Sequence, residues 1–471
     1  MCATAFVLLA LALPAQAQVD MQPLTRLDLF SAGRDAGFGQ DVWKGASADI
    51  ARAVIPTLAV RPLSPAGNSL ARRLLAQSAT APDDAGSDAD LAAARVRALL
   101  ALGEAPLVGS ILDHTPNLSQ NGPLSQIAAE AALDLGQDDR ACAIGEALTA
   151  GRGDLYWLRL RAYCQALGGK PDAAQLTFTL ANQQARDPVL VRLMAATVNG
   201  AGDPGPASLR SGLEYALSRH LKLDMAAALP TASTAIAEQV TAGLAGAAPA
   251  ATPSEPEIVG ALKAAKSFAA FVAAAKQTKL GLAALAQAKG PVADPLLEAS
   301  AALAAGDIDS ARAIRAAPAA PAATPVDPLD LAILDAALSA AVGKPDGPIL
   351  DRLVERAGMG DARTRSRGQA ATAIFASLGG DMADAARARF IDFDFRHGDA
   401  LAARLMMLQS DADARRVGET VLLALSVAEA GGAAGPAASD RARIIRSLAQ
   451  VGRKADAQAF AVEGLLSLET R

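Results

Sequence analysis

Apolar residues recur along most of this chain at helical spacing, and short polar turns interrupt them at regular intervals. Between residues 89 and 219 this alternation predicts a series of helices joined by short turns. Several of the segments open on Asp or Pro and end before Gly, which is the asymmetry expected at helix ends. The predicted helices are 91–102, 106–114, 123–135, 138–148, 154–167, 171–184, 188–198 and 206–219.

Glycines mark the turns of this segment with a repeat of 33 residues. They are Gly103, Gly136, Gly169 and Gly202. Five residues after each stands a small or slender residue, namely Val108, Ala141, Ala174 and Ala207. The same spacing recurs at Gly306 and Ala311, at Gly380 and Ala385, and at Gly452 and Ala457. A glycine ends a helix by adopting a left-handed cap, and a small residue in the next helix lets two helices cross closely.

This arrangement resembles the tetratricopeptide repeat, a helical hairpin with a period of 34 residues. The best match consists of Trp157, Leu160, Gly169, Ala174, Phe178 and Ala181, with one extra residue at the turn. The resemblance covers about 130 residues, from 89 to 219. It implies an α-solenoid, in which antiparallel hairpins stack into a right-handed superhelix.

The segments on either side of 89–219 keep helical patterns but lose the repeat. Residues 18–88 contain a helical stretch at 69–77 and are expected to form an N-terminal cap over the first hairpin. Residues 220–328 and 329–471 form two further helical segments. Their predicted helices are 258–277, 280–289, 295–304, 329–342, 349–357, 367–378, 441–451 and 455–468. Proline- and alanine-rich stretches at 247–257, 316–328 and 429–439 are expected to be linkers or loops.

Composition agrees with an all-α fold. The chain has 471 residues, too many for one compact core, and 51% of them are hydrophobic although only 3% are aromatic. Alanine supplies much of the apolar total, and alanine has the highest helix propensity and packs closely. Strands prefer the β-branched and aromatic residues that are scarce in this sequence.

The charge of the chain argues against nucleic acid as a partner. The formal net charge is −5 and the pI is about 5.4. Basic residues are mixed with acidic ones, and no stripe of lysine and arginine is long enough to follow a phosphate backbone.

The N-terminus has the features of a signal peptide, except that a positive charge before the apolar run is missing. An apolar run from Ala3 to Leu13 is followed by Pro14 and by Ala15-Gln16-Ala17, a small-x-small cleavage pattern. We therefore expect residues 1–17 to be removed and the protein to be exported to the periplasm or beyond. No transmembrane segment is expected in the mature chain.

Two cysteines, Cys142 and Cys164, remain after that cleavage. They are predicted on helices that lie side by side in a helical repeat, so their side chains could meet and form a disulfide. The alternative is that they are two small buried apolar residues.

Catalytic and metal-binding patterns are scarce, and neither a cofactor nor a metal is expected. The three histidines are far apart, and no nucleophile, phosphate-binding or dinucleotide motif is present. Asp392 and Asp394 are two residues apart and point to different sides if helical. A peptidoglycan-active enzyme remains the alternative, because this chain is similar in architecture to the superhelical part of soluble lytic transglycosylases. It would need distant carboxylates such as Glu130 and Asp154 to meet in a pocket.

The resemblance to tetratricopeptide repeats implies a binding scaffold whose concave groove holds a protein or a peptide. Tyr156, Arg159 and Tyr163 are the candidate groove residues, on the face away from Leu160 and Cys164. A role in assembling or maintaining the cell envelope is the context expected for an exported scaffold.

Overall fold

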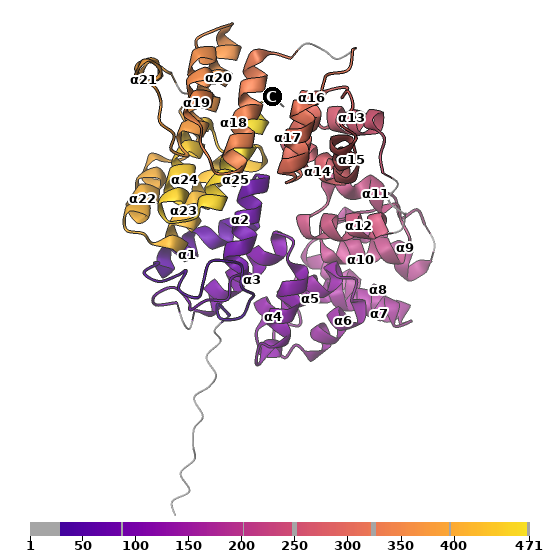
Figure 1. Ribbon diagram of the computed structural model, residues 1–471. Helices are drawn as coiled ribbons and strands as arrows, with labels where there is room; N and C mark the ends of the chain where they lie inside the picture. Colours follow the sequence, from indigo (N-terminus) through magenta and orange to yellow (C-terminus); the bar gives the residue numbers. More distant parts are fainter. Residues whose placement is uncertain are drawn as a thin grey trace, which may run out of the picture.

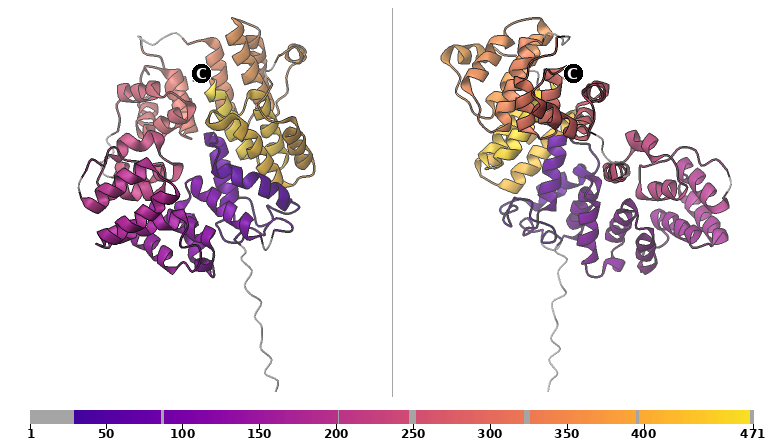
Figure 2. Two further views of the ribbon diagram at one scale, coloured as in Figure 1. Left: turned by 180° about the vertical axis from the view of Figure 1, so that it is seen from behind. Right: turned by 45° about the vertical axis from the view of Figure 1, so that its right-hand side comes forward.

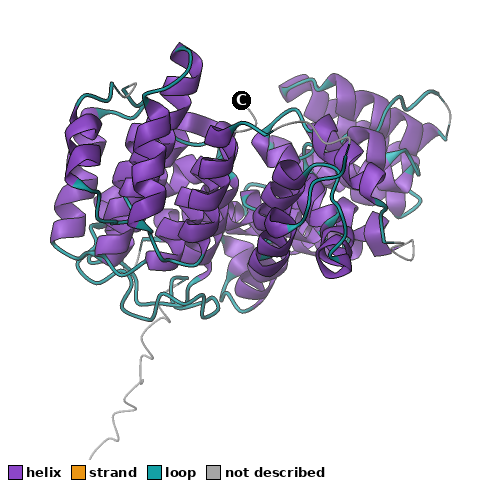
Figure 3. Ribbon diagram, turned by 45° about the horizontal axis from the view of Figure 1, so that its top comes forward, coloured by secondary structure: helices purple, strands orange, loops and turns teal. Residues whose placement is uncertain are grey.

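The fold is built from helices and the turns that join them (Figure 3). The computed structural model describes residues 29–85, 88–200, 202–246, 252–321, 326–394 and 397–468. It contains 25 α-helices, 69% helix and no strand within those ranges, so the predicted all-α class is confirmed. The expected signal peptide at 1–17 lies outside the described residues.

An irregular segment followed by two helices and a 3-10 turn begins the described chain. These elements are α1 (Ala48–Val54), η1 (Ile55–Ala59) and α2 (Pro65–Ala76). The guanidinium of Arg95, which is 0% exposed, holds the segment in place. It donates hydrogen bonds to the carbonyl oxygens of Leu75, Gln77, Leu29 and Ala32. One buried side chain thereby satisfies backbone groups that irregular structure would otherwise leave without partners.

The helices predicted between residues 89 and 219 are present, most with ends within one or two residues. They are α3 (Ala89–Ala101), α4 (Ala105–Asp113), η2 (Leu118–Gln120), α5 (Gly122–Asp134), α6 (Asp138–Ala147), α7 (Leu155–Leu167), α8 (Pro171–Gln184), α9 (Pro188–Asn199) and α10 (Gly212–His220). The last begins six residues later than predicted. Ser211 accounts for this, because its side chain accepts from the backbone of Glu214 and starts the helix there.

The predicted combination of a left-handed glycine and a buried small residue five positions later is present at five of the seven positions. Gly103, Gly136, Gly169, Gly306 and Gly452 have positive φ, and the small residue five positions later is buried in each case. The prediction was wrong at two positions. Gly379, rather than Gly380, has the left-handed conformation, and Ala207 lies outside any helix because α10 begins at Gly212.

Seven short helices follow α10. They are α11 (Met225–Ala228), α12 (Thr234–Gly246), α13 (Glu255–Ala264), α14 (Phe268–Gln277), α15 (Lys279–Ala288), α16 (Pro295–Ala304) and α17 (Ile308–Ala316), with η3 (Leu229–Thr231) after α11. The single helix predicted at 258–277 is two helices. Ser267 caps the second of them, and its side chain accepts from the backbone of Ala270. A serine at this position favours a new helix start over continuation.

The C-terminal region contains eight helices. They are α18 (Pro328–Ala341), α19 (Gly347–Ala357), α20 (Ala362–Ala376), α21 (Asp384–Ile391), α22 (Ala402–Asp413), α23 (Val417–Ala428), α24 (Ala438–Gln450) and α25 (Lys454–Ser467), with η4 (Glu429–Ala434). Helix α20 begins five residues before its predicted start, because Asp361 caps it by accepting from the backbone of Thr364. Helices α21, α22 and α23 were not predicted.

The two ends of the helical array are in contact. Helices α1 and α2 pack against α23, and α2 also packs against α25. Figure 1 and both views of Figure 2 show these helices side by side, although most of the chain separates them in the sequence. We call this contact, between residues 37–73 and helices α23 and α25, the closure. The N-terminal segment therefore contacts α3 on one side and helices near the C-terminus on the other.

Three buried glutamates hold the closure together. Glu419 accepts a hydrogen bond from the backbone of Ser47 at 2.6 Å, and Glu429 accepts one from the hydroxyl of Thr57 at 2.6 Å. Glu463 accepts one from the backbone of Ala66 at 2.5 Å. A buried carboxylate is costly unless such donors satisfy it, so these contacts account for three acidic residues in the core.

One helical stretch of the described chain meets the length and composition criteria for a membrane span. This stretch is Val417–Ala434, and 67% of it is buried inside the fold. It packs against α1, α2, α22 and α24, so it serves as the central helix of the C-terminal region.

Candidate functional site

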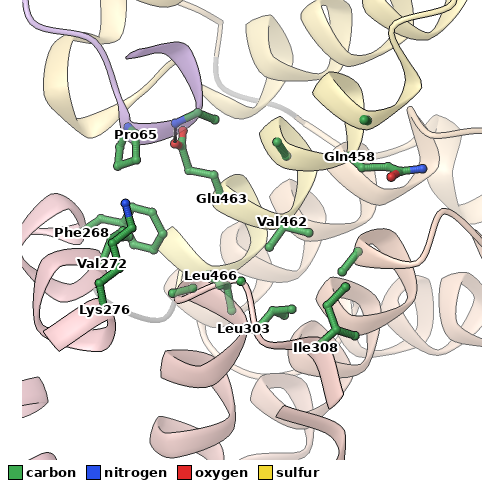
Figure 4. Close-up of a pocket in the computed structure, with 16 residues that line it drawn as sticks. Pro65, Phe268, Val272, Lys276, Leu303, Ile308, Gln458, Val462, Glu463 and Leu466 are labelled. Carbon is green, nitrogen blue, oxygen red and sulfur yellow. Dashed lines mark hydrogen bonds between the residues drawn. The ribbon is translucent and has the colours of Figure 1, made fainter. Parts of the chain in front are cut away.

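An apolar pocket lies next to the closure, where helices from four parts of the chain meet (Figure 4). Its volume is about 350 Å³. The wall is formed by the start of α2, by α14, by the α16–α17 turn and by one face of α25. Its larger apolar residues are Pro65, Phe268, Val272, Leu303, Ile308, Val462 and Leu466. A mainly apolar recess with a few polar groups has the character of a ligand site.

Glu463 is the acidic residue of this pocket, and its charge is compensated. Besides accepting from the backbone of Ala66, it accepts from the guanidinium of Arg441 at 2.8 Å. Arg441 is 1% exposed and also donates to the carbonyl oxygen of Phe460 at 3.0 Å. A buried pair of this kind is costly to break, because either partner alone leaves an unpaired buried charge.

Lys276 is the basic residue of the pocket wall. It lies on α14, one turn after Val272, and Figure 4 shows its ammonium group on the side of the pocket where Pro65 lies. The side chain is exposed, and no ion pair of Lys276 is present within the described residues. The pocket therefore combines apolar walls with one uncompensated positive charge.

The three residues predicted to line a groove on α7 do not form one open surface. Tyr163 is 0% exposed and lies in the core with Trp157 and Leu160, so its assignment to a groove is wrong. The hydroxyl of Tyr156 is buried. Arg159 is partly exposed and donates to the carbonyl oxygen of Ala185 at 2.9 Å. The prediction failed because α6, α8 and α9 all pack against α7, which leaves little of that helix free.

A pair of carboxyl groups one turn apart on α5 lies at the start of α10. Glu130 accepts a hydrogen bond from the backbone of Gly212 at 3.0 Å, whereas Oδ1 of Asp134 is buried without a partner. Burial, followed by the nearby charge of Glu130, raises the pKa of Asp134 to about 8. Burial is also the main cause that raises the pKa values of Glu130 and of Tyr156 beside it.

This carboxyl pair differs from the one that a catalytic function was expected to need. Asp154 precedes α7 and lies beside the turn at Gly151, and it is not among the groups that shift the pKa of Glu130. None of the residues that line the pocket belongs to the Glu130 group. No group of three or more His, Cys, Asp or Glu residues that could hold a metal ion occurs in the described ranges.

Cys142 and Cys164 lie at disulfide distance, with their Cα atoms 5.7 Å apart. They are on α6 and α7, which pack against each other as the hairpin pattern predicted. The predicted proximity is confirmed, and oxidation of the pair in the purified protein stays a prediction.

Sequence reasoning missed the pocket because no local pattern marks it. Nearly all of its residues come from segments that are widely separated in the sequence, at 65–66, 268–276, 303–308 and 455–466. One weak signal exists on α25, where Ala455, Ala459, Val462 and Leu466 recur at helical spacing on one face. Ala455 and Ala459 are exposed in the fold although they are apolar. Comparisons of this chain with protein-family models, with curated proteins and with solved structures give no match.

Proposed function

We propose that this protein is a non-catalytic binding scaffold of the cell envelope that holds an apolar segment of a protein or peptide partner. The observation that carries the proposal is the apolar pocket beside the closure. Burial of an apolar segment in such a recess contributes about 25 cal/mol per Å² of area removed from water. The function is presentation or retention of the partner, without turnover.

The arrangement of the hairpins supports a scaffold of the tetratricopeptide type. Positive-φ glycines at the turns and buried small residues in the following helices recur at 103–108, 136–141 and 169–174. We propose that these hairpins form an α-solenoid whose two ends meet at the closure. Under this proposal the binding site lies where the ends meet, and not along a groove that crosses α7.

Site-specific photocrosslinking in intact cells tests the binding proposal. A photoreactive amino acid at Ala459, an exposed residue of the pocket wall, is expected to capture one protein. The same amino acid at Ala273, which is exposed on α14 outside the pocket wall, is the matched control and is expected to capture none. Mass spectrometry of the adduct should find an apolar segment of the partner at the crosslink.

A second variant ties the adduct to the pocket. Ala304→Trp places an indole in the pocket wall and is expected to abolish the crosslink from position 459. An adduct that persists in this variant, an adduct to a polar segment, or the absence of any adduct would contradict the proposal.

Export is a separate part of the proposal and rests on the pattern at residues 1–17. N-terminal mass spectrometry of protein recovered from the periplasm is expected to find Gln18 as the first residue. Recovery of the intact chain from the cytoplasm would contradict export and leave the binding proposal to be judged by crosslinking. The pocket gives no support to the peptidoglycan-active alternative, because neither Glu130 nor Asp134 lines it.

A further inference from the structure

The pocket is small and mainly apolar, so it suits the apolar side chains of a few residues. The whole pocket has a volume of about 350 Å³. Apolar side chains of a partner can therefore enter it.

The charges around the pocket limit the occupant further. Glu463 is compensated by Arg441 and by the backbone of Ala66. Asp307, at the start of α17, accepts from Ser310, and the positive charge of Lys279 acts on it. Lys276 alone in the wall lacks an acidic partner among the described residues.

We propose that the pocket takes the C-terminal end of an apolar peptide, with its terminal carboxylate paired to the ammonium group of Lys276. Phe268 and Val272 precede Lys276 on the same face of α14, so apolar side chains of the peptide can contact them while the carboxylate reaches the ammonium. The assignment rests on the proposed function, and it adds the chemistry that selects the partner. An internal peptide segment has no carboxylate at this position and binds less well.

A pair of peptides that differ only at the C-terminus tests this assignment. The probes are a dansylated four-residue peptide of leucine and alanine with a free carboxylate and the same peptide with a C-terminal amide. Fluorescence titration of the full chain is expected to show about threefold tighter binding of the carboxylate form, the size expected for an exposed ion pair. High salt should remove this preference, because it screens exposed charges.

Two lysine variants assign the preference to its residue. Lys276→Met keeps the aliphatic stem and removes the charge, so both peptides should bind this variant equally. Lys266→Met is the matched control, because Lys266 is exposed, precedes α14 and lines no part of the pocket. It makes the same change in net charge and should keep the threefold preference.

The remaining outcomes separate this inference from the proposed function. Equal binding of both peptides to the unaltered protein, with loss in Ala304→Trp, overturns the carboxylate assignment and keeps the apolar site. If neither peptide binds the unaltered protein, or if Ala304→Trp leaves their binding unchanged, the proposed function is overturned as well. Dodecanoate and unlabelled peptide are also compared as competitors of the dansylated peptide. If dodecanoate displaces it at the lower concentration, the site is assigned to a fatty acid and the peptide assignment is overturned.

Discussion

At the scale of single residues, the buried charges of this protein differ in how well they are satisfied. Arg95 and Glu463 have several partners each, and those partners tie distant segments together. Asp134 differs, because its Oδ1 is buried without a hydrogen-bond partner among the described residues and no cation is among the groups that shift its pKa. The protein holds Asp134 in its neutral form up to about pH 8, because burial and Glu130 disfavour its charge.

The pH dependence of the free energy of unfolding should show the raised pKa of Asp134. Its pKa is about 8 in the fold against an ordinary value of 3.8, so the folded state binds more protons between these limits. The contribution of neutral Asp134 to the free energy of unfolding is therefore fully present below about pH 4 and is lost as the pH rises through 8. Asp134→Asn removes this loss and should raise the free energy of unfolding at pH 8 by at least about 2 kcal/mol.

Urea unfolding of both proteins from pH 5 to pH 9 measures this effect. The exposed Asp384→Asn variant is the control, and its curve should follow that of the unaltered protein. Parallel curves for Asp134→Asn and the unaltered protein across this range would refute the assignment of a neutral buried carboxyl group.

The two cysteines give a second prediction at this scale. Mass mapping without reductant should find a peptide that joins Cys142 to Cys164, which are 22 residues apart. The double variant Cys142→Ser with Cys164→Ser should lose about 3 kcal/mol of unfolding free energy, because the unfolded chain regains loop entropy. Two alkylatable thiols in protein recovered without reductant would show that the pair is reduced.

At the scale of elements, glycine has opposite effects at a helix end and inside a helix. Gly169 ends α7 at φ +68°, where an alanine side chain would meet no neighbour but would be strained by the backbone. Gly169→Ala should therefore cost about 1 kcal/mol. Gly260 lies inside α13 with open space around it, so Gly260→Ala should stabilise by about 0.5–1 kcal/mol. Thermal unfolding of the two variants should give shifts of opposite sign.

The irregular N-terminal segment depends on one side chain of α3. Arg95→Met keeps much of the volume but leaves the carbonyl oxygens of Leu75 and Gln77 without their donor. The variant should lose at least about 3 kcal/mol, since each unsatisfied buried group costs about 1–3 kcal/mol. Limited proteolysis should then cut within residues 29–46. Arg97→Met, an exposed change on the same helix, should produce neither effect.

At the scale of the whole molecule, the closure converts a linear series of helices into one whose ends support each other. Glu463→Ala removes the acceptor for Ala66 and leaves Arg441 buried without its carboxylate. Hydrogen exchange should accelerate in α2 and α25 and stay unchanged in α7 and α8, because distant hairpins open independently. The exposed Glu146→Ala should change no segment. Equal acceleration in all helices would show that the chain unfolds as one unit.

Local sequence rules predicted most of the individual helices but few of the contacts between helices. Pro171 and Pro295 begin helices that end where the pattern predicted, at Gln184 and Ala304. Caps, turns and amphipathic spacing act within a few residues, so one sequence is enough to recognise them. Helices α21, α22 and α23 were missed. In α23 every residue from Gly418 to Ala428 is buried, so the alternation of apolar and polar positions that marks an amphipathic helix is weak.

By itself, the sequence determined the all-helical class, the positions of most hairpin turns and the proximity of Cys142 to Cys164. All three depend on interactions between residues near one another in the chain. The tertiary structure alone decided that Tyr163 is buried, that the ends of the array meet and that α2, α14 and α25 enclose a pocket. The last two outcomes depend on contacts between segments hundreds of residues apart, and such contacts leave no periodic signal in the segments that make them. Tyr163 is buried by the neighbouring helices α6, α8 and α9, whose arrangement around α7 the helical spacing of α7 does not show.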